Sequence, residues 1–236
     1  MNDKEARNIL WFDQVCNDDV AFVGGKNASL GEMYQRLTPL GLRIPNGFVI
    51  TARAYREFVN KTGLTAMIRE TLDGLDTKDI KDLQIRGKKI RSAFDKVEFP
   101  DNIVAEIRSA YRDLSNACHM DEADTAVRSS ATAEDLPGAS FAGEHETYLN
   151  VVGEENVLRA IRDAMGSLFT DRAISYRVDK GFDHFAIALS VGVQKMVRSD
   201  KGSSGVMFTL DTESGFRNVV EINASWGWAK WWCRVR

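Results

Sequence analysis

The chain of 236 residues has few of the residues that mark several large classes of protein. It has three cysteines, three histidines and four prolines. An odd number of cysteines without C-x-x-C spacing argues against a disulfide framework and against a zinc site. No stretch approaches the roughly 20 apolar residues that cross a bilayer, and the polar start, MNDKEAR, is unlike a signal peptide. We therefore expect a cytoplasmic protein with no membrane partner.

A surplus of positive charge is also missing. The 31 lysines and arginines stand against 34 aspartates and glutamates. This balance leaves nothing extra to neutralise a phosphate backbone, so nucleic acid is not an expected partner. His119, His145 and His184 are scattered, without a second ligand at metal-binding spacing, and no metal ligand is assigned. With 44% hydrophobic residues, the chain is long enough for one large or two small domains with proper cores.

The first 120 residues indicate helices and short strands. A helix is expected after Gly24-Gly25, with Gly41 as its stop signal. Residues 73–96 are dominated by charge, and their periodicity is weak. The remaining expected elements of this part are a strand over residues 48–50, a helix over 52–61 that Thr51 caps, and a helix after Pro100-Asp101.

From residue 121 the pattern favours strands. Residues 186–197 alternate, with bulky side chains at odd positions and small ones at even positions, so something can approach one face closely. Strands over 206–210 and 218–223 are expected to complete an antiparallel meander with it. The other expected elements are strands over 125–129 and 147–151, a loop over 131–144, and helices over 154–169 and 170–180.

The fold class that these elements predict is α+β. We expect a mostly antiparallel sheet with flanking helices on one side. The expected parts are a helical and short-strand subdomain over residues 1–120, a sheet subdomain over 121–227, and a tail over 228–236.

Two segments could carry chemistry. Gly24-Gly25-Lys26 before a helix could hold a phosphate, because helix starts offer free N–H groups and the positive end of the dipole. The P-loop spacing is absent, and a glycine turn followed by a solvated lysine is the simpler interpretation. Arg128, in a short strand before a long loop with hydroxyls and glycines, could clamp a polyphosphate. The alternative is an edge-strand arginine beside an ordinary loop, although so long a loop is more often functional.

These segments together resemble the phosphoenolpyruvate synthase family. The resemblance runs from about Trp11 to Gly227. Its motifs are GGKNASLGEM at residues 24–33, IPNGF at 44–48, AVRSSATAEDLPGASFAGEHETYLN at 126–150, DRAISYR at 171–177, VQKMV at 193–197 and GVMFTLDTESG at 205–215.

The resemblance implies a nucleotide-binding domain of the ATP-grasp type, here incomplete. Whole enzymes of the family continue with a swivelling phosphohistidine domain and a pyruvate-binding barrel. They convert ATP, pyruvate and water to phosphoenolpyruvate, AMP and phosphate with Mg²⁺. The expected cofactors are thus ATP and Mg²⁺, and pyruvate or phosphoenolpyruvate would be bound by domains absent here.

Site residues follow from the same resemblance. Lys26 and Arg128 would hold the ATP phosphates, and the strand that ends at residues 194–197 would border the adenine. Neither the catalytic histidine nor the magnesium ligands are expected in this chain, so by itself it should be inactive. The residues assigned to the nucleotide are Lys26, Arg128, Thr132, Gly138, Ser140, Gly143, Gln194 and Met196.

The last nine residues depart from the family pattern. After Gly227 the family continues roughly Leu-Gly-Glu-X-Val-Val-Gln-Gly, whereas this chain has WAKWWCRVR. Because tryptophan has a single codon, much of the underlying DNA can be read back. A shift of one base restores Leu-Gly-Glu-Met-Val-Val-Gln-Gly. We therefore interpret residues 228–236 as a frameshift product outside the evolved core.

Two other interpretations remain open. One is a related dikinase, such as pyruvate phosphate dikinase or a rifampicin phosphotransferase, which shares the ATP domain and differs in the acceptor. The loop DLPGASFAG at residues 135–143 and the segment FTLDTESG at 208–215 favour the synthase. The other is a non-catalytic nucleotide-binding module.

Overall fold

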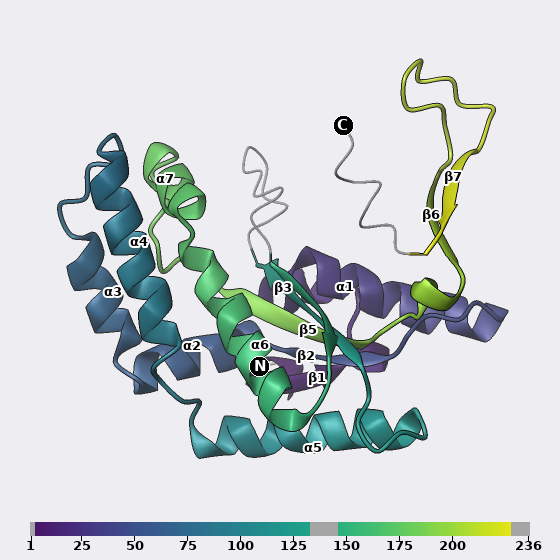
Figure 1. The fold of residues 1–236 in the computed structure, drawn as a ribbon, viewed down its shortest axis with the longest axis horizontal. Helices are drawn as coiled ribbons and strands as arrows, with labels where there is room; N and C mark the ends of the chain where they lie inside the picture. The colour runs from purple at the N-terminus through teal and green to yellow at the C-terminus, as the bar shows by residue number, and fades with distance from the viewer. Residues whose placement is uncertain (1–2, 133–145, 228–236) are drawn as a thin grey trace. The chain divides into compact units, whose positions relative to one another are not determined.

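The computed structural model describes residues 3–132 and 146–227. The chain divides into two compact units, Met1–Met196 and Val197–Arg236, which we describe separately. Figure 1 shows the course of the chain. Among the described residues, no helix has the length and apolar character needed to span a bilayer.

The first unit is built on a five-stranded sheet whose paired strands are all antiparallel. Its order is β1-β2-β5-β3-β4, so β5, the last of these five strands in the sequence, lies at the centre. Strands from both sides of residue 120 therefore share one sheet. The strands are β1 Ile9–Trp11, β2 Gly47–Ile50, β3 Thr125–Ala131, β4 Thr147–Val151 and β5 Leu189–Lys195.

Helices cover both faces of this sheet (Figure 1). β2 shows why: Phe48 and Ile50 belong to the larger apolar core, whereas Val49 belongs to a smaller core with Val23 and Ala28 of α1. The prediction that helices flank the sheet on one side only is wrong. Alternate residues of β2 point to opposite faces of the sheet, and each face packs into its own apolar core. The helices are α1 Val20–Leu37, α2 Ala52–Lys61, α3 Leu64–Leu72, α4 Ile80–Phe94, α5 Asp101–Ala117, α6 Glu154–Gly166 and α7 Asp171–Asp179.

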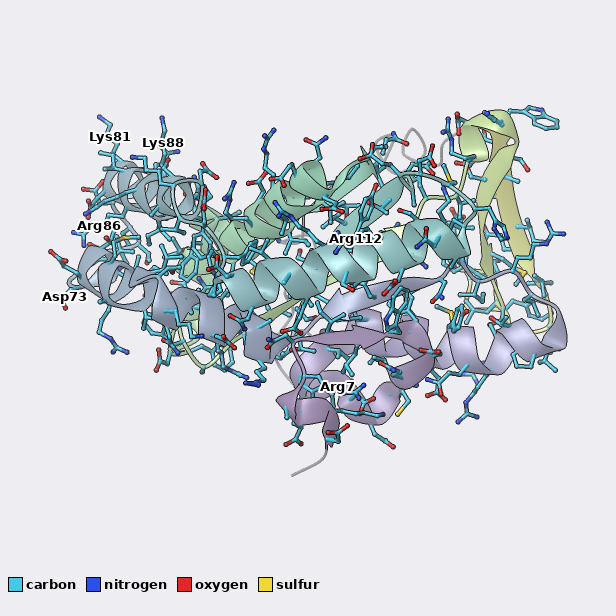
Figure 2. The ribbon with its side chains drawn as sticks, turned by 90° about the horizontal axis from the view of Figure 1, so that it is seen from below. Arg7, Asp73, Lys81, Arg86, Lys88 and Arg112 are labelled. Atoms are coloured by element: carbon cyan, nitrogen blue, oxygen red, sulfur yellow. The ribbon has the colours of Figure 1, made fainter. Side chains whose placement is uncertain are left out.

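The segment with weak periodicity is helical. α4 begins after Asp79, whose carboxylate accepts hydrogen bonds from the backbone of Lys81 and Asp82, both at 3.1 Å. Figure 2 shows Lys81 extending outward from this helix. Arg86 donates to the backbone oxygens of Thr71 and Asp73, which ties α4 to the end of α3. The buried stripe of α4 is Leu83, Gly87, Ile90 and Phe94, and a glycine within it weakens the apolar signal.

The predicted α+β class and antiparallel pairing are confirmed. The predicted meander is wrong, because β5 pairs with β2 and β3. In the second unit β6 (Ser203–Phe208) pairs with β7 (Glu221–Trp226) as a separate two-stranded sheet.

One face of the β6–β7 hairpin is apolar and exposed. Met207 lies opposite Ile222, and Gly205 lies opposite Ala224 on the same face. The exposed fractions are 64% for Met207, 67% for Ile222 and 87% for Trp226. We call Gly205, Met207, Ile222, Ala224 and Trp226 the hairpin face.

Candidate functional site

The first candidate segment forms a sharp turn inside α1. Gly24 has φ 72° and ψ 160°, so the helix is interrupted there and resumes at Gly25. This backbone region is almost exclusive to glycine. A Cβ at Gly24 would lie 2.3 Å from Ser130 Oγ and 2.8 Å from the Ser130 carbonyl oxygen. The glycine therefore allows the turn to sit directly on the end of β3.

Lys26 follows this turn with an exposed side chain. Its backbone N–H donates a hydrogen bond of 3.2 Å to Ser130 Oγ. Anions bind at the start of a helix because its first backbone N–H groups have no partner within the helix. One of those groups is already bonded here, so binding of a phosphate would depend on the remaining groups and on the side chain of Lys26.

Arg128 lies on an interior strand. β3 runs between β5 and β4, so the interpretation as an edge-strand arginine is wrong. Arg128 is paired with Gly192 on β5 and with Thr147 on β4, and its side chain is exposed. Ser130 lies two residues further along β3, on the same face as Arg128. Lys26 is bonded to that serine, so both cationic residues belong to the α1 side of the sheet.

The small face of β5 is occupied by α1. Ser190 lies opposite Ser130 in the ladder, and Asn27 Nδ2 donates to Ser190 Oγ at 3.0 Å. A Cβ at Gly192 would lie 2.3 Å from Asn27 Oδ1. The predicted close approach to the even residues is thus made, at these positions, by the protein's own helix.

The other assigned residues are placed as follows. Thr132 Oγ1 donates to the Ala188 carbonyl at 3.1 Å and accepts from the Ala188 N–H at 3.3 Å, which fixes the start of the long loop. Gln194 Nε2 donates to the Pro45 carbonyl at 3.0 Å. Met196 is buried. Gly138, Ser140 and Gly143 lie outside the described residues, and the same is true of the tail over 228–236.

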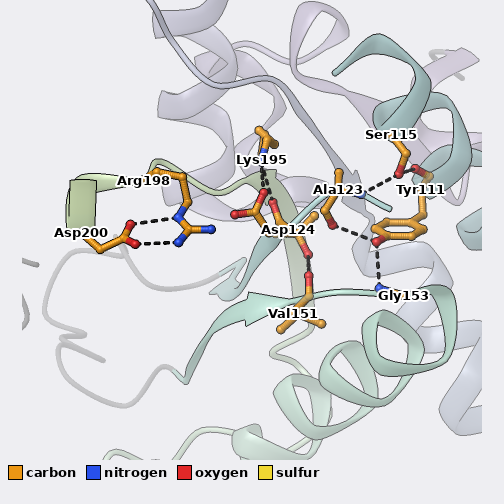
Figure 3. A network of polar contacts seen from close by, with 10 residues as sticks. Tyr111, Ser115, Ala123, Asp124, Val151, Gly153, Lys195, Arg198 and Asp200 are labelled. Atoms are coloured by element: carbon orange, nitrogen blue, oxygen red, sulfur yellow. Dashed lines mark hydrogen bonds and ion pairs between the residues drawn. The ribbon is translucent and has the colours of Figure 1, made fainter. Parts of the chain in front are cut away.

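A polar network holds the beginning of β3 (Figure 3). Tyr111 of α5 donates to the Ala123 carbonyl and accepts from the Gly153 N–H, both at 2.8 Å. Asp124 forms an ion pair with Lys195 at the end of β5. Sequence reasoning did not single out Lys195, because a lysine at the end of a bulky stripe gives no local signal of its distant partner.

A separate cavity of about 540 Å³ lies among α4, β4, α6 and the start of α7. Tyr148 and Asp163 line it, and Tyr148 faces away from the side of Arg128 because it is paired with Val127. Burial, with a smaller contribution from Glu146, raises the pKa of Tyr148 to about 12. Burial and then the charge of Asp95 raise the pKa of Asp163.

Within the part of the chain that the structure describes, the acidic, histidine and cysteine side chains are dispersed. Among residues 3–132 and 146–227, no three His, Cys, Asp or Glu side chains cluster closely enough to hold a metal ion. No magnesium ligand is assigned among these residues.

The geometry defines a mixed α+β unit that presents a lysine and an arginine on one side of its central sheet, beside a glycine turn. Residues 20–231 match the family model for the pyruvate phosphate dikinase AMP/ATP-binding domain, and the chain belongs to that family.

Curated relatives agree with this assignment. The chain is 56% identical over 225 residues to a phosphoenolpyruvate synthase of Aquifex aeolicus, which covers 95% of this chain and 26% of the relative. It is 53% identical to one of Helicobacter pylori, with 94% and 27% covered. A probable phosphoenolpyruvate synthase of Methanocaldococcus jannaschii is 49% identical, with 93% and 18% covered. The chain thus spans about a quarter of the length of the first two relatives.

Proposed function

We propose that this chain is the ATP-binding portion of a phosphoenolpyruvate synthase, and that it holds the ATP phosphates between Lys26 and Arg128. The observation that carries the proposal is the seating of the Gly24 turn on β3, which puts both residues on one side of the sheet. The match to an AMP/ATP-binding domain supports the nucleotide as the ligand.

The two cations suit complementary tasks. A guanidinium presents a planar fork that binds two phosphate oxygens at once, whereas an ammonium on a flexible stem acts as a mobile point charge. Arg128 on an interior strand would fix the orientation of the phosphates, and Lys26 would follow the charge as a phosphoryl group leaves. Both side chains are exposed, so a nucleotide can reach them.

The remaining assignments complete the proposed site. Gln194 and Met196 would border the adenine. The domain would be of the ATP-grasp type, and the phosphates would bring Mg²⁺ with them. The loop residues assigned to cover the phosphates are Thr132, Gly138, Ser140 and Gly143.

In the longer protein, the proposed reaction converts ATP, pyruvate and water to phosphoenolpyruvate, AMP and phosphate. A histidine on another domain would accept the pyrophosphoryl group first, and pyruvate would receive the remaining phosphoryl group later. The 236 residues alone are expected to bind ATP without completing this sequence.

A related dikinase with another acceptor is the second candidate, because the family model is shared by both. Identities of 56% and 53% to phosphoenolpyruvate synthases favour the synthase. Assaying a full-length protein with pyruvate and water, or with pyruvate and inorganic phosphate, separates them by the phosphate acceptor used.

Replacement of Arg128 tests the site directly. Arg128→Ala should weaken ATP binding by about a hundredfold, because a bidentate phosphate contact is worth roughly 3 kcal/mol. Isothermal titration of the chain with ATP measures this. Arg112→Ala is the matched control, since Arg112 is an exposed arginine of α5 whose ion pair with Glu154 is long, at 3.8 Å. Equal affinities for the two variants would leave Arg128 with a structural role only.

A further inference from the structure

A group of three fully buried polar side chains lies beneath the Gly24 turn. The exposed fractions are 1% for Asn27, 0% for Ser130 and 0% for Ser190. They come from α1, β3 and β5, which are far apart in the sequence. Buried polar groups are costly unless they are hydrogen-bonded, so their bonds show what this cluster maintains.

The bonds of this cluster join its members to one another and to the residues that flank the turn. Asn27 Nδ2 donates to the Val23 carbonyl at 3.1 Å and to Ser190 Oγ at 3.0 Å. Ser190 Oγ can donate to the Val23 carbonyl or to the Ser130 carbonyl, the latter at 3.1 Å. Ser130 Oγ accepts the N–H of Lys26. The residues immediately before and after Gly24-Gly25 are therefore bonded to the two central strands.

We infer that Asn27, Ser130 and Ser190 form a polar lock that positions Lys26 and Arg128 for the nucleotide phosphates. Ser130 and Arg128 are separated by two residues of one strand, about 7 Å. The bond from the Lys26 N–H to Ser130 Oγ then fixes the root of the lysine side chain against that same strand. The three are positioning residues, and the inference rests on the proposed function.

Gly192 offers a way to separate positioning from stability. A methyl group at this position would collide with Asn27 Oδ1, so Gly192→Ala should destabilise the chain. Asn27→Ala should also destabilise it, because a space is left and Ser190 loses a donor. In the double variant the new methyl group occupies the space that Asn27 leaves. The unfolding temperature of the double variant should therefore be higher than that of either single variant and close to that of the wild type. The hydrogen bonds of Asn27 remain lost in it.

The experiment measures the unfolding temperature and the affinity for ATP and for pyrophosphate in the chain and these three variants. We expect the double variant to recover stability while its affinity for both probes stays about tenfold or more below wild type. Recovery of affinity together with stability would overturn the lock and leave the proposed function intact. A wild-type chain that binds neither probe would instead refute the proposed function, and the inference with it.

Ser130→Ala provides an independent test if the double variant does not fold. It removes the acceptor of the Lys26 N–H and should weaken pyrophosphate binding by about fivefold to tenfold. Ser129→Ala is the matched control, since Ser129 is equally buried, lies on the opposite face of β3, and donates to the Glu146 carbonyl. Equal affinities for the two serine variants would contradict the positioning role.

Discussion

Gly24 is constrained by its backbone conformation and by its surroundings at once. Its φ and ψ lie in a region that other residues scarcely enter, and no space exists for a Cβ beside Ser130. Gly41 also has a positive φ, of 87°, but nothing lies within 4 Å of its Cβ position. Substitution at Gly41 therefore measures the cost of backbone strain alone, whereas substitution at Gly24 measures strain together with a steric collision.

Gly24→Ala should destabilise the chain by about 3 kcal/mol, because backbone strain and a collision with the backbone of β3 add together. Gly41→Ala should cost about 1 kcal/mol, from strain alone. Urea denaturation of the two variants measures the difference. Similar losses for both would show that the turn can move away from β3.

At the same scale, the sequence predicted Lys26 and Arg128 as a pair only through the family resemblance. Their common position on one side of the sheet depends on Ser130 and Asn27, whose types are ordinary in a loop or a helix. The small even face of β5 did signal a close approach. It could not reveal that the partner is α1, because that contact joins residues more than 160 positions apart, as the bond from Asn27 to Ser190 illustrates.

Asp163 lines the cavity among α4, β4, α6 and the start of α7. The pKa of its carboxyl is raised in the folded chain, so the free energy of unfolding depends on pH. The ionised carboxylate is less favourable in the folded chain than in the unfolded one, because it is partly buried and faces Asp95. Stability contributed by this group is therefore greatest below the unfolded pKa and falls as pH rises through the folded pKa.

Asp163→Asn should consequently raise the free energy of unfolding at pH 7, and its advantage should disappear near pH 3. Denaturation at both pH values measures the change. Asp113→Asn, at an exposed position of α5, is the control and should show no such gain. A variant that is less stable than wild type at pH 7 would show that the carboxylate is favourable as an ion.

Strong local signals predicted the elements well. The helix Ala52–Lys61 and the strand Thr147–Val151 match their predicted bounds. The helix was well marked, because Thr51 caps its start and Gly63 lies just beyond its end. α4 was missed because charge dominates its sequence and Gly87 lies in its buried stripe. α3 was also missed, although Leu64, Met67, Ile68 and Leu72 lie at helical spacing; it is only nine residues long and follows α2 almost directly. The strand order was not predictable, because each of the pairings of β5 with β2 and β3 joins distant segments.

At the scale of the whole molecule, the hairpin face exposes Met207, Ile222 and Trp226 in the second unit. A two-stranded sheet gains little stability by itself, and an apolar face on such a sheet favours association. The chain should therefore bind the dye ANS and self-associate at high concentration.

Ile222→Lys should reduce ANS fluorescence and self-association without changing the unfolding of the first unit. Sedimentation and dye binding measure the effect. Ser225→Lys, which introduces the same charge on the opposite side of β7 across from Ser204, is the control. Equal effects of the two variants would mean that net charge, and not the hairpin face, governs association.

The central position of β5 has a consequence for folding on the ribosome. β1 and β2 form one pair and β3 and β4 another, and β5 alone joins them. All of β5, which ends at Lys195, must leave the exit tunnel before the two pairs can become one sheet. Such non-local pairing slows folding, because the entropy cost of closing a long loop comes before the favourable energy of the contacts that the closed loop allows. The turn that carries Lys26 is synthesised early, yet it gains its final support from Ser190 only at the end, so the nucleotide site should be among the last parts of the unit to mature.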